Sequence, residues 1–483
     1  MNVALIVLDA VRADHVSCYG YPRSTTPNLD AFAAVNTRYA SVVAPGVWTF
    51  PSMATMFTGL YPSQHGMNRA DRSVPAELRL LAERLHDAGY RTGGFSANPY
   101  VGRMYGFDRS YDVFREFWGV SGGGGRSGVT GALNGAANRA YQWLWPRVRR
   151  TVKRSQTLTR AYQRYLRRKV EGRDKGAAAL VDAAVEWVTE ARRHPQPFFL
   201  YAHVMEAHGP LAPPSEHAAR FMDQPSIATA RQLDQDAMAY MAGANPLDDQ
   251  QLNLLRNLYD ASISYGDHHL RRLLDALGDD TVIVITADHG NSFGEHGILD
   301  HFFSVHQTLA SVPLIIRHPN IPPGIIHQPV GTIDITPTIL ETAGLDTTGL
   351  AGLSLSSHGS QGLVDPRECL VTEFLDPPLE RFQRFHRFDP VGFRRELRGV
   401  RRGDHKYIWS SDGREELYDL HTDPRETINL VDTQPTLLAD LRKLHDDWLL
   451  EVSSQPTEIR PAPSDFEVEE DVASTLRALG YLD

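Results

Sequence analysis

Val3-Ala4-Leu5-Ile6-Val7-Leu8-Asp9 is the stretch of this 483-residue chain that decides the fold. Its apolar part is unbroken, which is typical of a central strand in a parallel sheet that is covered on both faces. Asp9 follows directly, at the strand end where ligand sites of open α/β sheets lie. We therefore expect a doubly wound, mostly parallel sheet flanked by helices, with an acid at its functional edge. A helix cap is the alternative interpretation of Asp9.

Polar side chains also follow the strands predicted at 91–97, 197–202 and 281–286. They are Asn98, His203, His208, Asp288 and His289. Helices are predicted between the strands, at 78–88, 176–193 and 252–277. Because parallel strands share one carboxyl edge, these polar side chains are expected to meet there.

The stretch from Ala44 to Gly66 predicts a helix that begins near Pro51 and ends at Gly59. Thr49 therefore lies at or just before the helix N-terminus, where unpaired N–H groups and the helix dipole favour anions. A hydroxyl group at that place can attack a phosphoryl or sulfuryl group if its proton is removed. The alternative is that Thr49 only caps the helix.

A divalent cation held by Asp9, Asp288 and His289 would lower the pKa of the Thr49 hydroxyl and bind the anion under attack. The ion that we expect is Mn²⁺, Zn²⁺, Mg²⁺ or Ca²⁺. The candidate residues fall into three groups. They are Thr49, His208 and His301 for catalysis, Asn98 and His203 for substrate binding, and Asp9, Asp288, His289 and Thr49 for the metal.

The pattern of strands and helices changes after about residue 350. Residues 1–350 are predicted to form the catalytic α/β domain, with a basic helical insertion at about 122–175. Residues 351–483 are predicted to form a C-terminal subdomain with a small antiparallel sheet, a helix at 437–449 and an extended tail. We expect the tail to end in a short helix at 472–479.

Composition excludes several classes of protein. The net charge of −10 argues against nucleic acid as a partner, and two cysteines make no disulfide framework. The sequence predicts a cytoplasmic protein, since it shows neither a leader peptide nor an apolar span. The basic arm at 147–173 is either an anionic-membrane anchor or a solvated helix packed on the main domain.

At these residues the chain resembles the sulfatase family of the alkaline phosphatase superfamily. The matching motifs are Val7-Leu8-Asp9, Tyr19-Gly20, Thr26-Pro27-Asn28-Leu29-Asp30, Pro51-Ser52, Thr58-Gly59-Leu60-Tyr61-Pro62, His65-Gly66, Glu206-Ala207-His208-Gly209-Pro210, Asp288-His289-Gly290, Val312-Pro313-Leu314-Ile315, Asp334 to Thr338, Glu416-Leu417-Tyr418-Asp419-Leu420, Asp423-Pro424 and Asn429-Leu430. The resemblance implies a mostly parallel sheet between helices and a small C-terminal antiparallel domain.

Four positions depart from the family pattern. Thr49 stands where family sulfatases carry a Cys or Ser that becomes formylglycine, so no formylglycine is expected. Met53 replaces the motif arginine, Ala10 replaces a second aspartate, and His301 stands where a lysine is usual. What remains is similar to threonine-nucleophile branches that act on phosphoesters, phosphodiesters or phosphonates, or transfer phospho-head groups.

Three hypotheses follow. The first is a metal-dependent hydrolase that cleaves sulfate or phosphate esters of a small molecule, glycan or lipid through Thr49. The second is a transferase that moves phospho-head groups at a membrane surface, suggested by the basic arm. The third is a non-catalytic family member that binds a partner, suggested by the lost arginine and aspartate.

Overall fold

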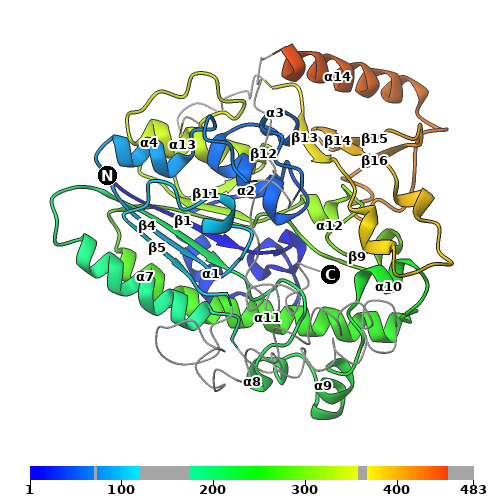
Figure 1. The fold of residues 1–483 in the computed structure, drawn as a ribbon, viewed down its shortest axis with the longest axis horizontal. Helices are drawn as coiled ribbons and strands as arrows, with labels where there is room; N and C mark the ends of the chain where they lie inside the picture. The colour runs from blue at the N-terminus through cyan, green and yellow to red at the C-terminus, as the bar shows by residue number, and fades with distance from the viewer. Residues whose placement is uncertain (70–72, 119–173, 357–366, 455–483) are drawn as a thin grey trace, which may run out of the picture.

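The computed structural model describes residues 1–69, 73–118, 174–356 and 367–454. Its main element is an eight-stranded sheet (Figure 1). From one edge to the other, the strands are β11 (Gly324–Ile326), β2 (Thr37–Tyr39), β10 (Leu314–Arg317), β7 (Thr281–Thr286), β1 (Asn2–Leu8), β6 (Phe198–Val204), β4 (Arg91–Ser96) and β5 (Val113–Glu116).

The central strand β1 pairs in parallel with both β6 and β7, and β4 continues the parallel order. β10 runs antiparallel to both of its neighbours. Val3 to Val7 expose no surface, because helices cover both faces of this part of the sheet. The predicted mostly parallel sheet is confirmed, with one antiparallel strand inside it.

Helices lie on the two sides of the sheet (Figure 1). α7 (Ala177–Ala191) packs against α11 (Asp249–Leu277) on one side, below the sheet in the figure. α2 (Thr49–Thr58) and α4 (Leu81–Asp87) both contact α13 (Ile335–Thr342) on the opposite side. This double cover explains why the central strands are unbroken apolar runs in the sequence.

Local capping shifts two of the predicted helix starts. α11 begins earlier than the predicted 252–277, because the Asp248 carboxylate accepts a hydrogen bond from the Gln251 N–H (2.8 Å). α4 begins later than predicted, because the Glu83 carboxylate accepts a hydrogen bond from the Leu80 N–H (2.7 Å). Short-range side-chain contacts therefore decide these helix ends.

A second, four-stranded antiparallel sheet lies C-terminal to the main one. Its strands and the helix that packs on it are β13 (Leu370–Phe374), β14 (Leu397–Arg402), β15 (His405–Ser410), β16 (Glu415–Asp419) and α14 (Pro435–Ser454). Leu441 and Trp448 of α14 share a core with Val400 and Tyr407 of the sheet. The predicted C-terminal antiparallel sheet is confirmed, while the domain boundary at 350 stays a prediction.

Glu373 on β13 joins this sheet to the stretch that leads into α2. Its backbone N–H donates to the carbonyl oxygen of Pro45 (2.7 Å). Its buried carboxylate accepts hydrogen bonds from the Ser63 N–H (2.8 Å) and from Arg398 Nε (2.9 Å). Charge-assisted hydrogen bonds of this kind are among the stronger ones. The approach to α2 is thus held by a strand of the second sheet.

Shorter elements lie on the connections. They are α1 (Pro27–Ala33), β3 (Val42–Val43), α3 (Pro62–His65), α8 (Ser215–Ala218), α9 (Gln224–Ala230), α10 (Ala237–Met241), β8 (Ser292–Phe293), β9 (Leu299–Asp300), α12 (Gln307–Ala310) and β12 (Val330–Gly331). Among the helices of the described residues, none combines the length and apolar character that crossing a bilayer requires.

Several predictions fall outside the described residues. They concern the basic arm at 147–173, nearly all of the insertion at 122–175, the tail and the helix at 472–479. At the end of the insertion, Lys175 is buried and its ammonium group donates to the carbonyl oxygens of Glu206 and His208. Lys175 therefore belongs to the core and not to a solvated basic face.

His65 is a buried histidine that links α3 to α2. Its Nδ1 accepts a hydrogen bond from the Met67 N–H (3.0 Å), and its Nε2 lies 3.0 Å from Thr55 Oγ1. Since Nδ1 is an acceptor, the neutral ring donates from Nε2. Burial lowers the pKa of His65 from 6.5 to about 3, so the folded chain keeps this ring neutral.

The free energy of unfolding should therefore fall as the pH drops from 7 to 5. In this range His65 takes up a proton in the unfolded chain and not in the folded one, which costs about 2 kcal/mol of stability. Urea unfolding at several pH values measures the slope. His65→Gln should show a shallower slope than the wild-type protein, and an unchanged slope would contradict the assignment.

Candidate active site

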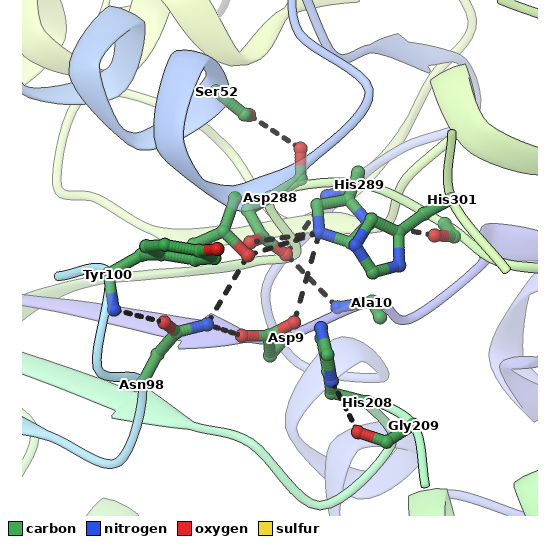
Figure 2. Close-up of polar contacts among 12 residues, drawn as sticks. Asp9, Ala10, Ser52, Asn98, Tyr100, His208, Gly209, Asp288, His289 and His301 are labelled. Atoms are coloured by element: carbon green, nitrogen blue, oxygen red, sulfur yellow. Dashed lines mark hydrogen bonds and ion pairs between the residues drawn. The ribbon is translucent and has the colours of Figure 1, made fainter. Parts of the chain in front are cut away.

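Polar side chains from several strand ends meet at one edge of the main sheet, as the sequence predicts (Figure 2). Asp9 follows β1, Asn98 follows β4, and Asp288 with His289 follows β7. Asp9, Asn98, Asp288 and His289 all have no exposed surface. The edge is therefore a closed polar cluster in which every charge needs a compensating partner.

Each of the two carboxylates has one satisfied oxygen. Asp9 Oδ2 accepts hydrogen bonds from Asn98 Nδ2 and from His203 Nε2 (3.0 Å). Asp288 Oδ1 accepts from the backbone N–H groups of Ala10 and His289, both at 3.0 Å. The other two oxygens, Asp9 Oδ1 and Asp288 Oδ2, accept no hydrogen bond from any described residue. Buried acceptors without donors point to a missing cationic partner.

His289 faces the same two oxygens with an acceptor atom. Its Nδ1 donates to the Gly290 carbonyl oxygen (2.8 Å), and burial lowers its pKa, so the neutral ring carries its lone pair on Nε2. Nε2 lies 3.4 Å from Asp288 Oδ2 and 3.9 Å from Asp9 Oδ1. Neighbouring ligands of a divalent ion are about 3 Å apart. The three atoms therefore fit a divalent cation.

The pKa values of the two carboxylates show how strongly they interact. Burial acts to raise the pKa of Asp9, but His208, His203 and His289 outweigh it and hold the pKa well below its usual value. Burial and the charge of Asp9 raise the pKa of Asp288. Two like charges this close disfavour one another, and a cation between them would relieve the repulsion.

His203 lies within β6, where it is fully buried and contacts Asp9. A potential metal-ligand group of the described residues comprises Asp9, His203 and Asp288, with ligand atoms within 4.8 Å of one another. However, His203 Nε2 donates to Asp9, and its Nδ1 lies 2.7 Å from the Tyr201 hydroxyl. We prefer His289 as the ligand, because the hydrogen bonds of His203 orient Asp9 instead. A substrate-binding role for His203 stays a prediction.

Thr49 opens α2, where the sequence predicts it. Gly46 allows the preceding loop to cross the helix start, since a Cβ there would lie 2.7 Å from the Ser52 backbone nitrogen. Ser52 Oγ in turn donates to the Asp288 carbonyl oxygen (2.6 Å). The N-cap residue is Trp48, and no side chain caps the helix, so the interpretation of Thr49 as a helix cap is wrong.

The Thr49 hydroxyl points into the cluster. It lies 3.3 Å from His289 Nε2, to which it donates, and 3.3 Å from Asn98 Nδ2, from which it accepts. The Asn98 amide is fixed by the Tyr100 N–H, which donates to its oxygen (2.8 Å). The hydroxyl is therefore oriented by one donor and one acceptor, beside the two unpaired carboxylate oxygens.

His301 lies beside His289, and His208 lies below both of them, next to Asp9 (Figure 2). The centroid of the His301 ring lies 4.5 Å from that of His289 and 4.9 Å from that of His208. Burial lowers the pKa of His208 to about 4, and its Nδ1 donates to the Gly209 carbonyl oxygen (2.6 Å). His301 Nδ1 forms an ion pair with Asp300. The structure thus brings all the predicted site residues together.

The structure describes Met53 and Ala10, two of the positions that are expected from the sequence to depart from the family pattern. Met53 is fully buried inside α2 and cannot supply a charge. Ala10 adopts a left-handed backbone (φ 58°), from which its N–H reaches Asp288. The side chains that the sequence did not single out are Tyr201 and Asp300. Asp300 directly precedes His301, which is the one sequence signal that could have identified it.

Comparison with known proteins shows which family models match the chain. The family model described as Sulfatase matches residues 1–345, and one described as N-sulphoglucosamine sulphohydrolase, C-terminal, matches residues 294–452. The chain is 24% identical over 470 residues to the uncharacterized sulfatase YidJ of Escherichia coli K12, covering 93% of this chain and 86% of that protein.

The chain is also similar to a second relative over part of its length and to a solved structure over nearly all of it. The choline-sulfatase of Rhizobium meliloti is 32% identical over 209 residues, covering 40% of this chain and 38% of that protein. The structure of the phosphonate monoester hydrolase of Agrobacterium radiobacter has the same fold, with a TM-score of 0.66, 22% identity and coverage of 94% and 95% of the two chains. Because the first family model covers well over half of the 483 residues, the chain belongs to the sulfatase family.

Proposed function

We propose that this protein is a metal-dependent hydrolase that cleaves sulfate or phosphate esters with Thr49 as the nucleophile. The observation that carries the proposal is the placement of the Thr49 hydroxyl. It lies within 3.3 Å of both His289 Nε2 and Asn98 Nδ2, at the edge of a cluster with two unpaired carboxylate oxygens. A merely structural threonine would be expected to bond to its own helix instead.

Asp9, Asp288 and His289 would hold the cation, with Mn²⁺, Zn²⁺, Mg²⁺ and Ca²⁺ as candidates. When bound, such an ion lowers the pKa of a neighbouring hydroxyl and neutralises charge on the anion under attack. The residues around it serve this chemistry. Asn98 donates to Thr49 Oγ1 and can stabilise the negative charge that develops there.

Before the first step, the Thr49 hydroxyl gives its proton to solvent water, and Thr49 Oγ1 then attacks the sulfur or phosphorus atom as an alkoxide. The bond from that atom to the ester oxygen breaks, and the leaving alcohol takes a proton from a general acid. We assign this role to His301, because its Nδ1 faces the carboxylate of Asp300 and its ring centroid lies 4.5 Å from that of His289. His208 has a low pKa and is better suited to bind the substrate oxygens as a neutral ring.

In the second step, water attacks the sulfated or phosphorylated Thr49. His301, now without its proton, accepts one from the water. The bond between Thr49 Oγ1 and the sulfur or phosphorus atom breaks, sulfate or phosphate leaves, and Thr49 is released as the alkoxide that began the first step. A sulfated or phosphorylated threonine has no second hydroxyl group on the same carbon, so the anion cannot leave by elimination and the attack of water is required.

Two observations bear on the choice of anion. The relative named choline-sulfatase and the family itself favour sulfate esters. A threonine nucleophile favours phosphoryl chemistry, and one solved structure of the same fold is a phosphonate monoester hydrolase. The esters that we propose as substrates include small molecules and glycans, and both anions belong in the assay.

The other hypotheses have less support. A transferase at a membrane surface rests on the basic arm at 147–173, which lies outside the described residues. Cytoplasmic location likewise stays a prediction. A non-catalytic role has less support for two reasons. The Thr49 hydroxyl is oriented by its neighbours, and burying two carboxylates that repel each other costs stability that a protein without catalytic activity would not need to lose.

Thr49→Ala should lower kcat by at least about a thousandfold for any ester that the protein cleaves, because the attacking atom is lost. Thr49→Ser keeps the hydroxyl and should retain measurable activity. Steady-state kinetics on 4-nitrophenyl sulfate and 4-nitrophenyl phosphate with added Mn²⁺ test this. Full activity of Thr49→Ala would rule out the nucleophile.

Metal binding is tested separately, by melting temperature with and without Mn²⁺. At a hundredfold excess over Kd, the ion should stabilise the wild-type protein by about 2.7 kcal/mol. Asp288→Asn should lose this gain, while its metal-free form should be at least as stable as the wild type, since a repelling charge is removed. Asp432→Asn, at an exposed acid, is the control and should keep the gain.

The general-acid assignment predicts a dependence on the leaving group. His301→Gln should lower kcat/KM by about 10² to 10⁴ for alkyl esters, whose alcohols must be protonated as they leave. The loss should be much smaller for 4-nitrophenyl esters. His327→Gln, at an exposed histidine, serves as the control. An equal loss for both ester types would argue that His301 binds substrate only.

A further inference from the structure

Arg381 places a positive charge beside the candidate active site from the C-terminal part of the chain. It lies in a short 3₁₀ helix (Leu379–Phe382) on the connection between β13 and β14. Its guanidinium carbon is 4.4 Å from the centre of the Phe302 ring. Phe302 directly follows His301, and their ring centroids are 4.5 Å apart. The cation thus lies over the ring of the residue that follows the proposed acid.

No described residue lies at hydrogen-bond distance from this charge. Within the described residues, the Arg381 guanidinium makes no hydrogen bond and no ion pair, whereas nearby Arg384 donates to Asp236 (2.6 Å). The charge of Arg381 acts on Asp300, but the Asp300 carboxylate already contacts His301 Nδ1. Burial acts to raise the pKa of Asp300, and His301, His208 and Arg381 together hold it below its usual value.

Aromatic rings connect Arg381 with the nucleophile. Trp48 precedes Thr49, and its ring centroid is 6.0 Å from that of Phe302 and 5.8 Å from that of Tyr100. A guanidinium group that stacks on a ring keeps its N–H donors in its own plane, at the edge. Such an edge binds the oxygens of a carboxylate or sulfate in a bidentate manner.

We propose that Arg381 binds an anionic substituent, either a carboxylate or a second sulfate-like group, on the leaving group of the substrate. This inference rests on the proposed hydrolase function and adds a substrate class, namely esters whose alcohol carries its own negative charge. It also accounts for the position of the residue. Arg381 lies on the His301 side of the cluster, where the leaving group departs in the proposed mechanism.

Kinetics with matched substrates test this. Arg381→Gln should lower kcat/KM at least about tenfold, mostly through KM, for 2-carboxy-4-nitrophenyl esters, because a charge-assisted bidentate pair is lost. The plain 4-nitrophenyl esters should stay within about twofold. Arg381→Lys should recover part of the loss, since it restores charge without the planar edge. Arg387→Gln, at an exposed arginine of the same segment, should change neither substrate.

A binding measurement tests the inference without turnover. Isothermal titration of the leaving groups compares 5-nitrosalicylate and 4-nitrophenol-2-sulfonate with 4-nitrophenol, and so distinguishes a carboxylate site from a sulfate-like site. Arg381→Gln should weaken one or both anions about tenfold and leave 4-nitrophenol unchanged. Equal affinity of wild type and variant for both anions would overturn the inference. If the wild-type protein hydrolysed no ester but still bound the anions more tightly than Arg381→Gln does, only the proposed function would be overturned.

Discussion

The repulsion between two buried carboxylates is the constraint on which the rest of the site depends. Asp9 and Asp288 each keep one oxygen without a donor among the described residues, and the lone pair of His289 faces both. Such a cluster is costly unless positive charge is supplied. The parallel pairing of β1 with β7 brings the two acids together, and the hydrogen bonds of Ala10, Asn98 and His203 hold them there. The fold thus maintains an arrangement that is unfavourable without a cation.

The sequence is informative where the pattern is local. An apolar run that ends in a polar residue identifies a strand and its functional end together, so Asp9, Asp288 and His289 could be predicted. Tyr201 could not, because within the apolar run of β6 it is indistinguishable from a core residue until its hydroxyl is seen beside His203. Arg381 could not either, since its proximity to Phe302 depends on how two distant loops fold. Local patterns predict which residues meet at the strand ends, whereas tertiary packing decides which residues lie around them.

Two residues near Thr49, Met53 and Ala10, are expected to change the electrostatics of the site in opposite directions. Relative to the family pattern expected from the sequence, Met53 would remove a positive charge from the helix, and Ala10 would remove a carboxylate from the loop after β1. The backbone N–H of Ala10 still binds Asp288, so the local geometry survives the loss of the side chain. Since one charge of each sign is lost, the balance between the acids and their counter-charge changes less than either substitution alone suggests.

Glu373 has a consequence for the order in which the protein becomes functional. Its backbone and carboxylate hold Pro45 and Ser63, on both sides of the helix that carries Thr49. During synthesis, residues 45–63 leave the ribosome long before β13 has been synthesised. The main sheet can begin to assemble in that interval, but the loop before Thr49 lacks its anchor. The placement of Thr49, the proposed nucleophile, is therefore tied to a late event in translation, and an incomplete chain would carry Thr49 without holding it in place.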